Sequence, residues 1–262
     1  MAVEAQHADA GSRPLISVRG LTLTYAQRRV LAAERTETVA LRDVSFDLVS
    51  GKSLALVGPS GSGKSSLARC LVLLERPNEG KILYQGQNLL TLSREELKVA
   101  RREIHLIFQD SGLSLNPRFT VEELVAEPLM IHKAFENKPE IDRRVRTAMD
   151  QVELNHGFLA RRCSELSGGQ RQRVAIARAL ALQPKLLILD EALSSLDLST
   201  QGQIANLLLD LQAQYSLAYL FVTHDLLLAS VMAHEVAVIR EGRIVQHDMP
   251  AIVLTANLQP VS

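Results

Sequence analysis

Cysteine, glycine and proline are all scarce in this sequence. There are only two cysteines, Cys70 and Cys163, and neither belongs to a CxxC motif or has a histidine at the spacing of a metal site. We therefore expect two free thiols in a reducing compartment, because disulfides are rare in the cytosol. The 14 glycines and 9 prolines among 262 residues exclude a collagenous or linker-like chain, and 47% hydrophobic residues indicate a globular protein.

The sequence also lacks net charge and long apolar runs. Its 29 lysines and arginines balance 29 aspartates and glutamates, so no bulk positive field draws the protein onto nucleic acid, although a local anion site remains possible. No apolar run approaches the ~20 residues of a membrane helix. Residues 1–14 lack the apolar core of a signal peptide. We predict a cytoplasmic protein with a flexible N-terminus and no nucleic-acid partner.

Hydrophobic periodicity predicts an α/β fold. Alternating apolar and polar residues predict strands at residues 16–18, 21–25 and 41–48, with the charged residues 26–38 as a solvated loop. Further strands are predicted at residues 53–57, 81–84, 104–108, 186–190 and 218–222, a hairpin at 236–246, and helices at 65–74, 94–102, 199–215 and from residue 225.

The strand pattern stops between residues 110 and 182. Thr120 and Glu123 form a capping box, which marks the start of a helix, and helical periodicity continues through residues 141–152 and 170–182. We predict a mostly helical subdomain, about residues 110–182, inserted in the α/β core.

One segment has the pattern of a phosphate-binding loop. The sequence GxxxxGK[ST] is formed, between a predicted strand and a predicted helix, by Gly58, Pro59, Ser60, Gly61, Ser62, Gly63, Lys64 and Ser65. Glycines allow backbone N–H groups to point at the β-phosphate, and the helix start directs its positive end at the anion. Lys64 is expected to reach the β- and γ-phosphate oxygens, and the Ser65 hydroxyl to bind Mg²⁺.

Two adjacent acids follow the buried strand 186–190. Ligands of open α/β sheets collect at the carboxyl ends of strands, where Asp190 and Glu191 lie. We expect Asp190 to hold Mg²⁺, usually through water, and Glu191 to polarise the water that attacks the γ-phosphate.

A third motif, the signature Leu166-Ser167-Gly168-Gly169-Gln170, determines the family. Together with the phosphate loop, the acid pair, Gln109, Asp197 and His224, it resembles the motif set of the ATP-binding-cassette (ABC) ATPases, in unbroken order over residues 16–244. The resemblance implies an α/β P-loop NTPase fold with a RecA-like core, an N-terminal antiparallel β subdomain and the inserted helical subdomain. It implies one domain over residues 15–250, followed by a short C-terminal tail at 251–262.

The signature is expected to act on the nucleotide of a second chain. Phosphoryl transfer needs extra donors on the γ-phosphate, and this phosphate loop supplies no arginine finger. Ser167 and Gly169 open the predicted helix, so a hydroxyl, N–H groups and the helix dipole can form an anion site. The resemblance implies a head-to-tail pair of ATPase subunits, homo- or heterodimeric, that sandwiches two ATP molecules between the phosphate loop of one chain and Ser167, Gly168, Gly169 and Gln170 of the other.

The resemblance also assigns roles to single residues. By this analogy, Tyr25 stacks on adenine, and Ser66 joins the phosphate loop in binding the nucleotide. Gln109 senses Mg²⁺ and the attacking water, Asp197 communicates across the dimer, and His224 contacts the γ-phosphate. These assignments come from the family motifs, since an aromatic residue at a strand end and a single histidine are not specific signals by themselves.

Within the family, the segment from Phe108 to Arg118 resembles one group of importers. Phe108-Gln109-Asp110 followed by Ser114-Leu115-Asn116-Pro117-Arg118 is similar to the ATPase subunits that import oligopeptides, dipeptides and nickel. The implied partners are two transmembrane permease subunits and, indirectly, a substrate-binding protein, which places the chain at the cytoplasmic face of the membrane. Lys52 departs from this group, where an acid is usual. The cysteines of the group's C-terminal extension are absent, so no iron–sulfur cluster is expected.

Alternatives remain open at this stage. Residues 114–118 are expected to begin a surface that receives a short helix of a membrane subunit, with Leu115 and Arg118 as contacts, or Asn116-Pro117 makes only a turn. An ABC exporter or lipoprotein-release ATPase shares every catalytic motif. A non-transport regulator is a further alternative, but such proteins usually have two cassettes or a long coiled-coil insertion, and neither is present in this sequence.

Overall fold

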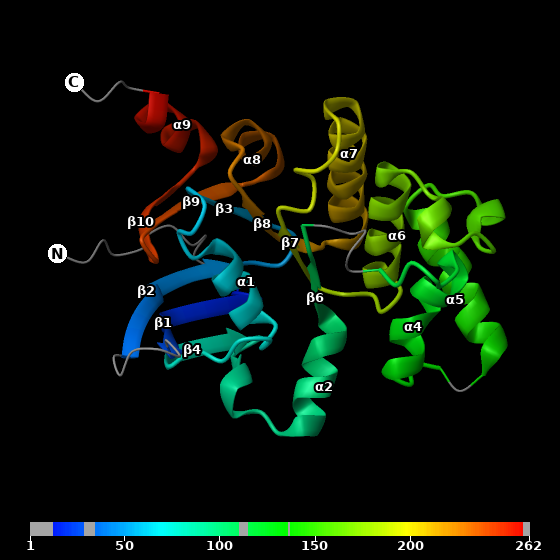
Figure 1. The fold of residues 1–262 in the computed structure, drawn as a ribbon, viewed down its shortest axis with the longest axis horizontal. Helices are drawn as coiled ribbons and strands as arrows, with labels where there is room; N and C mark the ends of the chain where they lie inside the picture. Colours follow the sequence, from blue (N-terminus) through cyan, green and yellow to red (C-terminus); the bar gives the residue numbers. More distant parts are fainter. Residues whose placement is uncertain (1–12, 29–34, 110–114, 136, 259–262) are drawn as a thin grey trace. The chain divides into compact units, whose positions relative to one another are not determined.

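The structure, a computed structural model, describes residues 13–28, 35–109, 115–135 and 137–258 (Figure 1). They divide into two units, each with its own strands and helices. The first unit contains the described residues up to Leu97 and those from Ala218 onward, and the second contains those from Lys98 to Leu217. The predicted helical insertion at 110–182 falls inside the second unit, and the prediction of a single domain over 15–250 stays a prediction.

An antiparallel sheet forms part of the first unit. Its strands β1 (Ile16–Arg28), β2 (Arg35–Leu48), β4 (Glu79–Tyr84) and β5 (Gln87–Asn88) lie in the order β2-β1-β4-β5. The strands predicted at 16–18 and 21–25 are one strand with a register shift between Val18 and Leu21. Gly20 lies in this irregularity with a positive φ of 59°, which glycine adopts without a steric penalty.

The predicted loop at residues 26–38 is wrong at both ends. Ala26 pairs with Glu37, and Arg28 with Arg35, so the hairpin of β1 and β2 continues into this segment. Charge predicts solvent exposure, but strand pairing uses backbone groups that every one of these residues has. Residues 29–34 lie outside the described residues.

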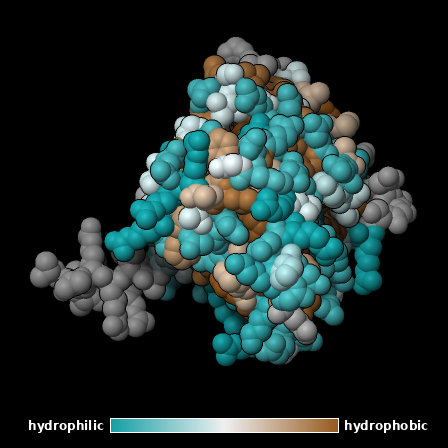
Figure 2. Space-filling view, turned by 90° about the vertical axis from the view of Figure 1, so that its right-hand side faces the viewer, coloured by the Kyte–Doolittle hydropathy of each residue, from teal (hydrophilic) through white to brown (hydrophobic). Residues whose placement is uncertain are grey.

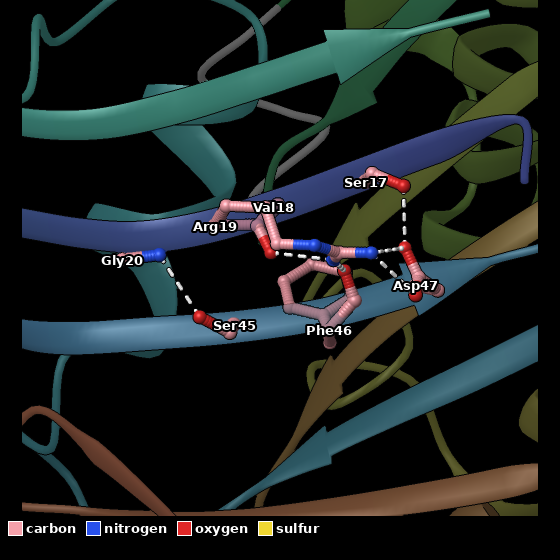
Figure 3. A network of polar contacts seen from close by, with 7 residues as sticks. All are labelled: Ser17, Val18, Arg19, Gly20, Ser45, Phe46 and Asp47. Carbon is pink, nitrogen blue, oxygen red and sulfur yellow. Dashed lines mark hydrogen bonds and ion pairs between the residues drawn. The ribbon is translucent and has the colours of Figure 1, made fainter. Parts of the chain in front are cut away.

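Polar contacts join β1 to β2 (Figure 3). The Arg19 guanidinium bonds both carboxylate oxygens of Asp47 at 2.7 Å and donates to the Phe46 carbonyl at 3.1 Å. Asp47 also accepts a hydrogen bond from Ser17, and the Gly20 N–H donates to the Ser45 hydroxyl at 2.9 Å. Because the ion pair is exposed, it contributes about 1 kcal/mol or less. The backbone pairing of these strands and the burial of apolar side chains such as Leu21, Val44 and Phe46 contribute more to the stability of the sheet.

Parallel strands form the other part of the first unit. Strand β3 (Ser53–Val57) pairs in parallel with β8 (Ala218–Thr223) and β9 (Glu235–Arg240), and every residue of β3 and β8 is buried. A continuous apolar run is typical of a strand covered on both faces. Strand β10 (Arg243–Asp248) completes the predicted hairpin with β9, which turns at Glu241 and Gly242.

Helices α1 (Lys64–Leu71), α8 (Leu226–Met232) and α9 (Pro250–Leu258) accompany these strands. Most of the predicted C-terminal tail at 251–262 is therefore helical. Helix α9 contacts α8, β9 and β10, and the Val253 side chain is buried. Helix α2 (Arg94–Glu103) starts at Ser93, whose backbone N–H and hydroxyl both donate to the Glu96 carboxylate in a capping box.

The second unit combines two parallel strands with a helical bundle. Strands β6 (Ile104–Ile107) and β7 (Leu186–Asp190) pair in parallel register, and α4 (Val121–Ile131), α5 (Lys138–Gln151) and α6 (Gly168–Leu180) contact one another. The helices expected between residues 120 and 182 are thus confirmed, and α7 (Leu198–Tyr215) matches the helix expected at 199–215.

Arg144 joins two helices of the bundle through buried hydrogen bonds. Arg144 of α5 donates from Nε to the Ala181 carbonyl at 2.7 Å and also bonds the Leu180 carbonyl at the end of α6. The side of the bundle on which α4 and α5 lie in Figure 1 is predominantly hydrophilic, with hydrophobic residues in smaller patches (Figure 2).

The two cysteines are free thiols, as the sequence analysis expects. Cys70 and Cys163 are free and buried, and burial raises the pKa of the Cys70 thiol to about 12, so it stays protonated and unreactive. No helix within the described ranges has both the length and the apolar character needed to cross a membrane.

Candidate nucleotide-binding site

Close backbone neighbours explain why two positions of the predicted phosphate loop, Gly58 and Gly63, need glycine. The loop connects buried β3 to α1, which is the strand–loop–helix order that the motif requires. A Cβ on Gly58 would lie 2.2 Å from the Ile239 carbonyl oxygen. Gly63 is the N-cap of α1 with φ 105°, and a Cβ there would lie 2.4 Å from the Ala40 carbonyl oxygen. Both contacts are with backbone, which cannot move aside as a flexible side chain could.

Hydrogen bonds from the β9–β10 turn and from Lys64 fix the backbone of this loop. The Gly242 N–H in the β9–β10 turn donates to the Ser62 carbonyl at 3.0 Å. The ammonium of Lys64, a buried side chain, donates to the carbonyls of Gly58 at 2.8 Å and Pro59 at 2.9 Å, so it lies across the loop. Pro59, Ser60 and Gly61 are exposed at the loop tip.

One atom of the loop is suited to a ligand. Ser62 Oγ is buried and has no hydrogen-bond partner among the described residues. A buried polar atom without a partner is costly, by about 1–3 kcal/mol, unless a bound group pairs with it. The loop therefore fits an anion with several oxygens, such as the phosphates of a nucleotide, and the N-terminus of α1 favours the same charge.

Three further predicted residues lie in the first unit with the loop. His224 directly follows β8 as Gly58 directly follows β3, and Val57 and Thr223 are registered partners, so both residues lie at the carboxyl ends of neighbouring parallel strands. Tyr25 of β1 bonds through its hydroxyl to the Ser66 hydroxyl of α1 at 3.0 Å. The structure therefore brings His224, Tyr25 and Ser66 to the phosphate loop.

The catalytic candidates Gln109, Asp190 and Glu191 lie in the second unit. Strands β6 and β7 pair in parallel with Ile107 opposite Leu189. Gln109 and Glu191 each come two residues after this pair, so they lie at the same edge of the sheet. Asp190, the last residue of β7, is buried, whereas Gln109 is exposed.

The turn after β7 has a restricted backbone. Glu191 adopts a positive φ of 48°, which is uncommon for a residue with a side chain and is frequent at functional sites. Its carbonyl accepts hydrogen bonds from the Ser194 N–H at 3.1 Å and the Ser194 hydroxyl at 2.8 Å. These bonds fix the direction in which the chain leaves the strand.

The signature residues lie at the start of α6 and pack beside the start of α7. Ser167 is the N-cap of α6, and a reciprocal capping box joins it to Gln170, with N–O distances of 2.9 and 3.3 Å. The hydroxyl oxygen accepts in this box, which leaves its hydrogen for an external acceptor. A Cβ on Gly169 would meet the Thr200 methyl group at 2.6 Å, and one on Gly168 would meet Leu196 at 3.5 Å.

Asp197 holds the same junction. Its two carboxylate oxygens accept from the Thr200 N–H at 2.9 Å and the Thr200 hydroxyl at 2.7 Å, which caps α7. These hydrogen bonds, from the backbone first, hold the pKa of Asp197 below its ordinary value. The signature and Asp197 are therefore linked through Thr200, which sequence reasoning did not identify.

The segment predicted to dock a membrane subunit forms a turn. The Phe119 N–H donates to the Asn116 carbonyl and the Arg118 N–H donates to the Asn116 side chain, both at 3.1 Å, as the alternative interpretation predicted. The turn exposes Arg118 but buries Leu115, so the prediction of Leu115 as a surface contact is wrong. Its apolar side chain packs in the core of the helical unit. Asp110 and Ser114 lie outside the described residues.

A comparison of the sequence with protein families agrees with this arrangement. The sequence model of the family described as "ABC transporter" matches residues 41–194, which is more than half of the chain. The chain belongs to the ABC transporter family. This confirms the predicted family and fold class.

Similar curated proteins are ATP-binding proteins of an import system. The chain is 46% identical over 234 residues to the glutathione import ATP-binding protein GsiA of Salmonella typhimurium, and 45% identical to GsiA of Escherichia coli strain K12. Each match covers 89% of this chain and 37% of the relative. The chain therefore spans about two fifths of the length of these relatives. The predicted resemblance to importer ATPases is confirmed.

Solved structures of ABC cassettes share the fold. The dimeric post-hydrolysis state of the ATP-binding cassette MJ0796, bound to ADP and Pi, has a TM-score of 0.78 and 29% identity, covering 90% of this chain and 98% of that one. CbiO1 of Clostridium perfringens, part of the ABC transporter complex CbiONQ, has a TM-score of 0.79 and 26% identity, covering 93% and 92%.

The candidate metal ligands have the chemistry that Mg²⁺ prefers. They are oxygen donors: the Ser65 hydroxyl, the Gln109 amide and the Asp190 carboxylate. The described part of the chain has no cluster of three or more His, Cys, Asp or Glu side chains that could hold a metal by itself. Mg²⁺ is usually held by one or two protein ligands together with substrate phosphates, so each of these groups is a suitable ligand by its chemistry.

Proposed function

We propose that this chain binds MgATP and hydrolyses it as the motor subunit of an ABC importer. The observation that carries the proposal is the phosphate loop, whose buried Ser62 Oγ has no partner within the described residues and whose backbone is braced at Gly58 and Gly63. Family membership supports the same substrate.

In this proposal the first unit binds the nucleotide. The backbone N–H groups of the loop and the Lys64 ammonium hold the β- and γ-phosphates, after the ammonium exchanges its bonds to the loop carbonyls for phosphate oxygens. Ser66 hydrogen-bonds the phosphates, Tyr25 offers its ring face to the adenine, and His224 donates to the γ-phosphate. Ser65, Gln109 and Asp190 hold the magnesium ion, which supplies positive charge for the developing negative charge of the transferred group.

The second unit activates the water. Glu191 acts as general base and takes a proton from the water that attacks the γ-phosphate, and Gln109 orients that water. The turn at Glu191 supports this role, because the two Ser194 bonds fix the backbone from which the carboxylate extends.

Hydrolysis requires a second copy or a related ATPase subunit. Ser167, Gly168, Gly169 and Gln170 provide a hydroxyl and helix N–H groups to the γ-phosphate on the partner chain, and Asp197 lies beside them to communicate across the dimer. The dimeric state named for MJ0796 supports such a pair.

The transported cargo belongs to the class of peptides or of nickel and other metal chelates. The relatives' name, glutathione import, favours peptides, because glutathione is a tripeptide. In this proposal two permease subunits receive the ATPase pair at the cytoplasmic face of the membrane, and a substrate-binding protein delivers the cargo to them. The turn that exposes Arg118 contributes to the surface that meets a permease helix.

The substitution Glu191→Gln tests this proposal. It removes the base but keeps the nucleotide-binding groups, so the variant should bind ATP, stop hydrolysing it and accumulate a dimer with ATP and Mg²⁺, measured by light scattering after gel filtration. Lys64→Ala is the matched control and should lose ATP affinity by roughly tenfold or more, because a charge-assisted bond to phosphate is removed. Hydrolysis by Glu191→Gln within about threefold of the parent contradicts the assignment.

A further inference from the structure

The hydroxyl of Tyr25 has two hydrogen-bond partners, Ser66 and Glu75. Ser66 was assigned to the nucleotide site by the family resemblance, whereas Glu75 has no assigned role. The hydroxyl donates to the Glu75 carboxylate, and it shares a hydrogen bond with Ser66 Oγ. Burial, first, and the bond to Glu75 raise the pKa of Tyr25, so the phenol stays protonated and remains a donor. The side chain as a whole is 36% exposed, so part of the ring remains open to solvent.

Glu75 is itself attached to the helix that follows the phosphate loop. The chain reverses after α1 with Leu73 at a positive φ of 54°, and the N–H groups of Leu74 and Glu75 donate to the Arg69 carbonyl at 2.9 and 3.3 Å. The Arg69 guanidinium then bonds the other Glu75 oxygen at 3.3 Å. Glu75 therefore moves with α1, and so with the phosphate loop.

These bonds connect Tyr25 of β1 to the phosphate-binding helix. Backbone reversal fixes Glu75, Arg69 orients its carboxylate, and the carboxylate fixes the hydroxyl end of the ring. An aromatic ring held in this way presents one face at a constant distance from the loop, without the loss of side-chain freedom that binding otherwise requires.

We propose that Glu75 is a positioning residue for the nucleotide base, which holds the Tyr25 ring in its base-binding orientation relative to the phosphate loop. The inference rests on the proposed function, because it requires that the loop binds phosphates and that Tyr25 meets the base. Ordering one free side chain on binding lowers affinity by about 2–10-fold. Because Glu75 orders the Tyr25 ring before the ligand arrives, the parent protein avoids this loss.

Two ligands separate this role from a general effect on the site. ADP has the base and is not hydrolysed, whereas pyrophosphate has only the phosphates. In calorimetry with the full chain and Mg²⁺, Glu75→Ala should raise the Kd of ADP by about 2–10-fold and leave the Kd of pyrophosphate unchanged. Glu75→Gln keeps an oxygen acceptor and should stay close to the parent, and Glu79→Gln, an exposed carboxylate on β4, should change neither Kd.

The variant Tyr25→Ala, used as a background, tests whether Glu75 acts through the Tyr25 ring. Glu75→Ala should have no further effect on ADP in that background, since there is no ring to hold, and Tyr25→Phe should reproduce the Glu75→Ala effect without disturbing the fold. If Glu75→Ala weakens pyrophosphate as much as ADP, or still weakens ADP in the Tyr25→Ala background, the positioning role is overturned. If Lys64→Ala leaves both ligands bound as in the parent, the proposed function itself fails.

Discussion

The signature packs against α7 at Gly169, where a side chain has no room beside Thr200. Gly169 lies inside α6, where replacing glycine by alanine normally stabilises a helix by about 0.5–1 kcal/mol. Here the added Cβ would lie 2.6 Å from the Thr200 methyl carbon, while the next atoms, also of Thr200, are 3.9 Å away. Overpacking of this kind costs about 1–3 kcal/mol. We expect Gly169→Ala to lower the free energy of unfolding by about 1–2 kcal/mol.

The variant Thr200→Ser removes the methyl group that causes the clash. Its hydroxyl can keep the 2.7 Å bond to Asp197, so the cap of α7 survives. In this background, Gly169→Ala should stabilise the protein by about 0.5–1 kcal/mol relative to Thr200→Ser alone. Urea unfolding of the four proteins in this cycle measures both values.

Hydrolysis should recover with stability in this cycle. The proposed role of Gly169 uses its backbone N–H, whereas a Cβ there points at Thr200, so Gly169→Ala disturbs the nucleotide contact only by displacing α6 from α7. The single variant should therefore hydrolyse ATP at least about tenfold more slowly than the parent, and the double variant should return close to the rate of Thr200→Ser. If Gly169→Ala is more stable than the parent, the packing of the signature on Thr200 is wrong. A double variant that is stable but still slow would show that the Cβ itself obstructs the nucleotide, and would contradict this geometry.

Two further predictions concern the second unit. Arg144→Met should lower the free energy of unfolding by roughly 2–4 kcal/mol, because two buried carbonyls of α6 lose a charged donor, whereas Arg143→Met, at an exposed position, should have little effect. Burial lowers the pKa of His105 from its ordinary 6.5 to about 4, so the unfolded chain binds more protons in this range. Stability should therefore fall as the pH drops from 6.5 toward 4, and His105→Gln should flatten this part of the unfolding profile.

The sequence was sufficient for the elements that carry motifs. Buried strands such as β3 and β7 consist of continuous apolar residues, and the phosphate loop, the acid pair and the signature each follow or open such an element. Local chemistry determines these features, so a short stretch of sequence identifies them. The capping box of Thr120 was readable for the same reason.

Contacts between distant segments were not predictable in this way. The pairing of residues 26–28 with 35–37 depends on backbone bonds, which the charged side chains do not reveal. The bond from Tyr25 to Glu75 and the packing of Gly169 on Thr200 join positions that no shared motif marks. The burial of Leu115 is also a tertiary effect, because an apolar residue within a polar turn can face either side.

Mixing two inactive variants tests the central claim, that one chain's signature acts on its partner's nucleotide. Ser167→Arg obstructs the partner's γ-phosphate site, and Lys64→Ala loses bound ATP, so each variant alone should be inactive. A mixed dimer has one composite site in which the intact Lys64 of one chain faces the intact Ser167 of the other, and the mixture should therefore regain part of the parental ATPase rate. Mixed dimers that form, as shown when a tag on one variant co-purifies the untagged other, but hydrolyse no ATP would contradict action between chains.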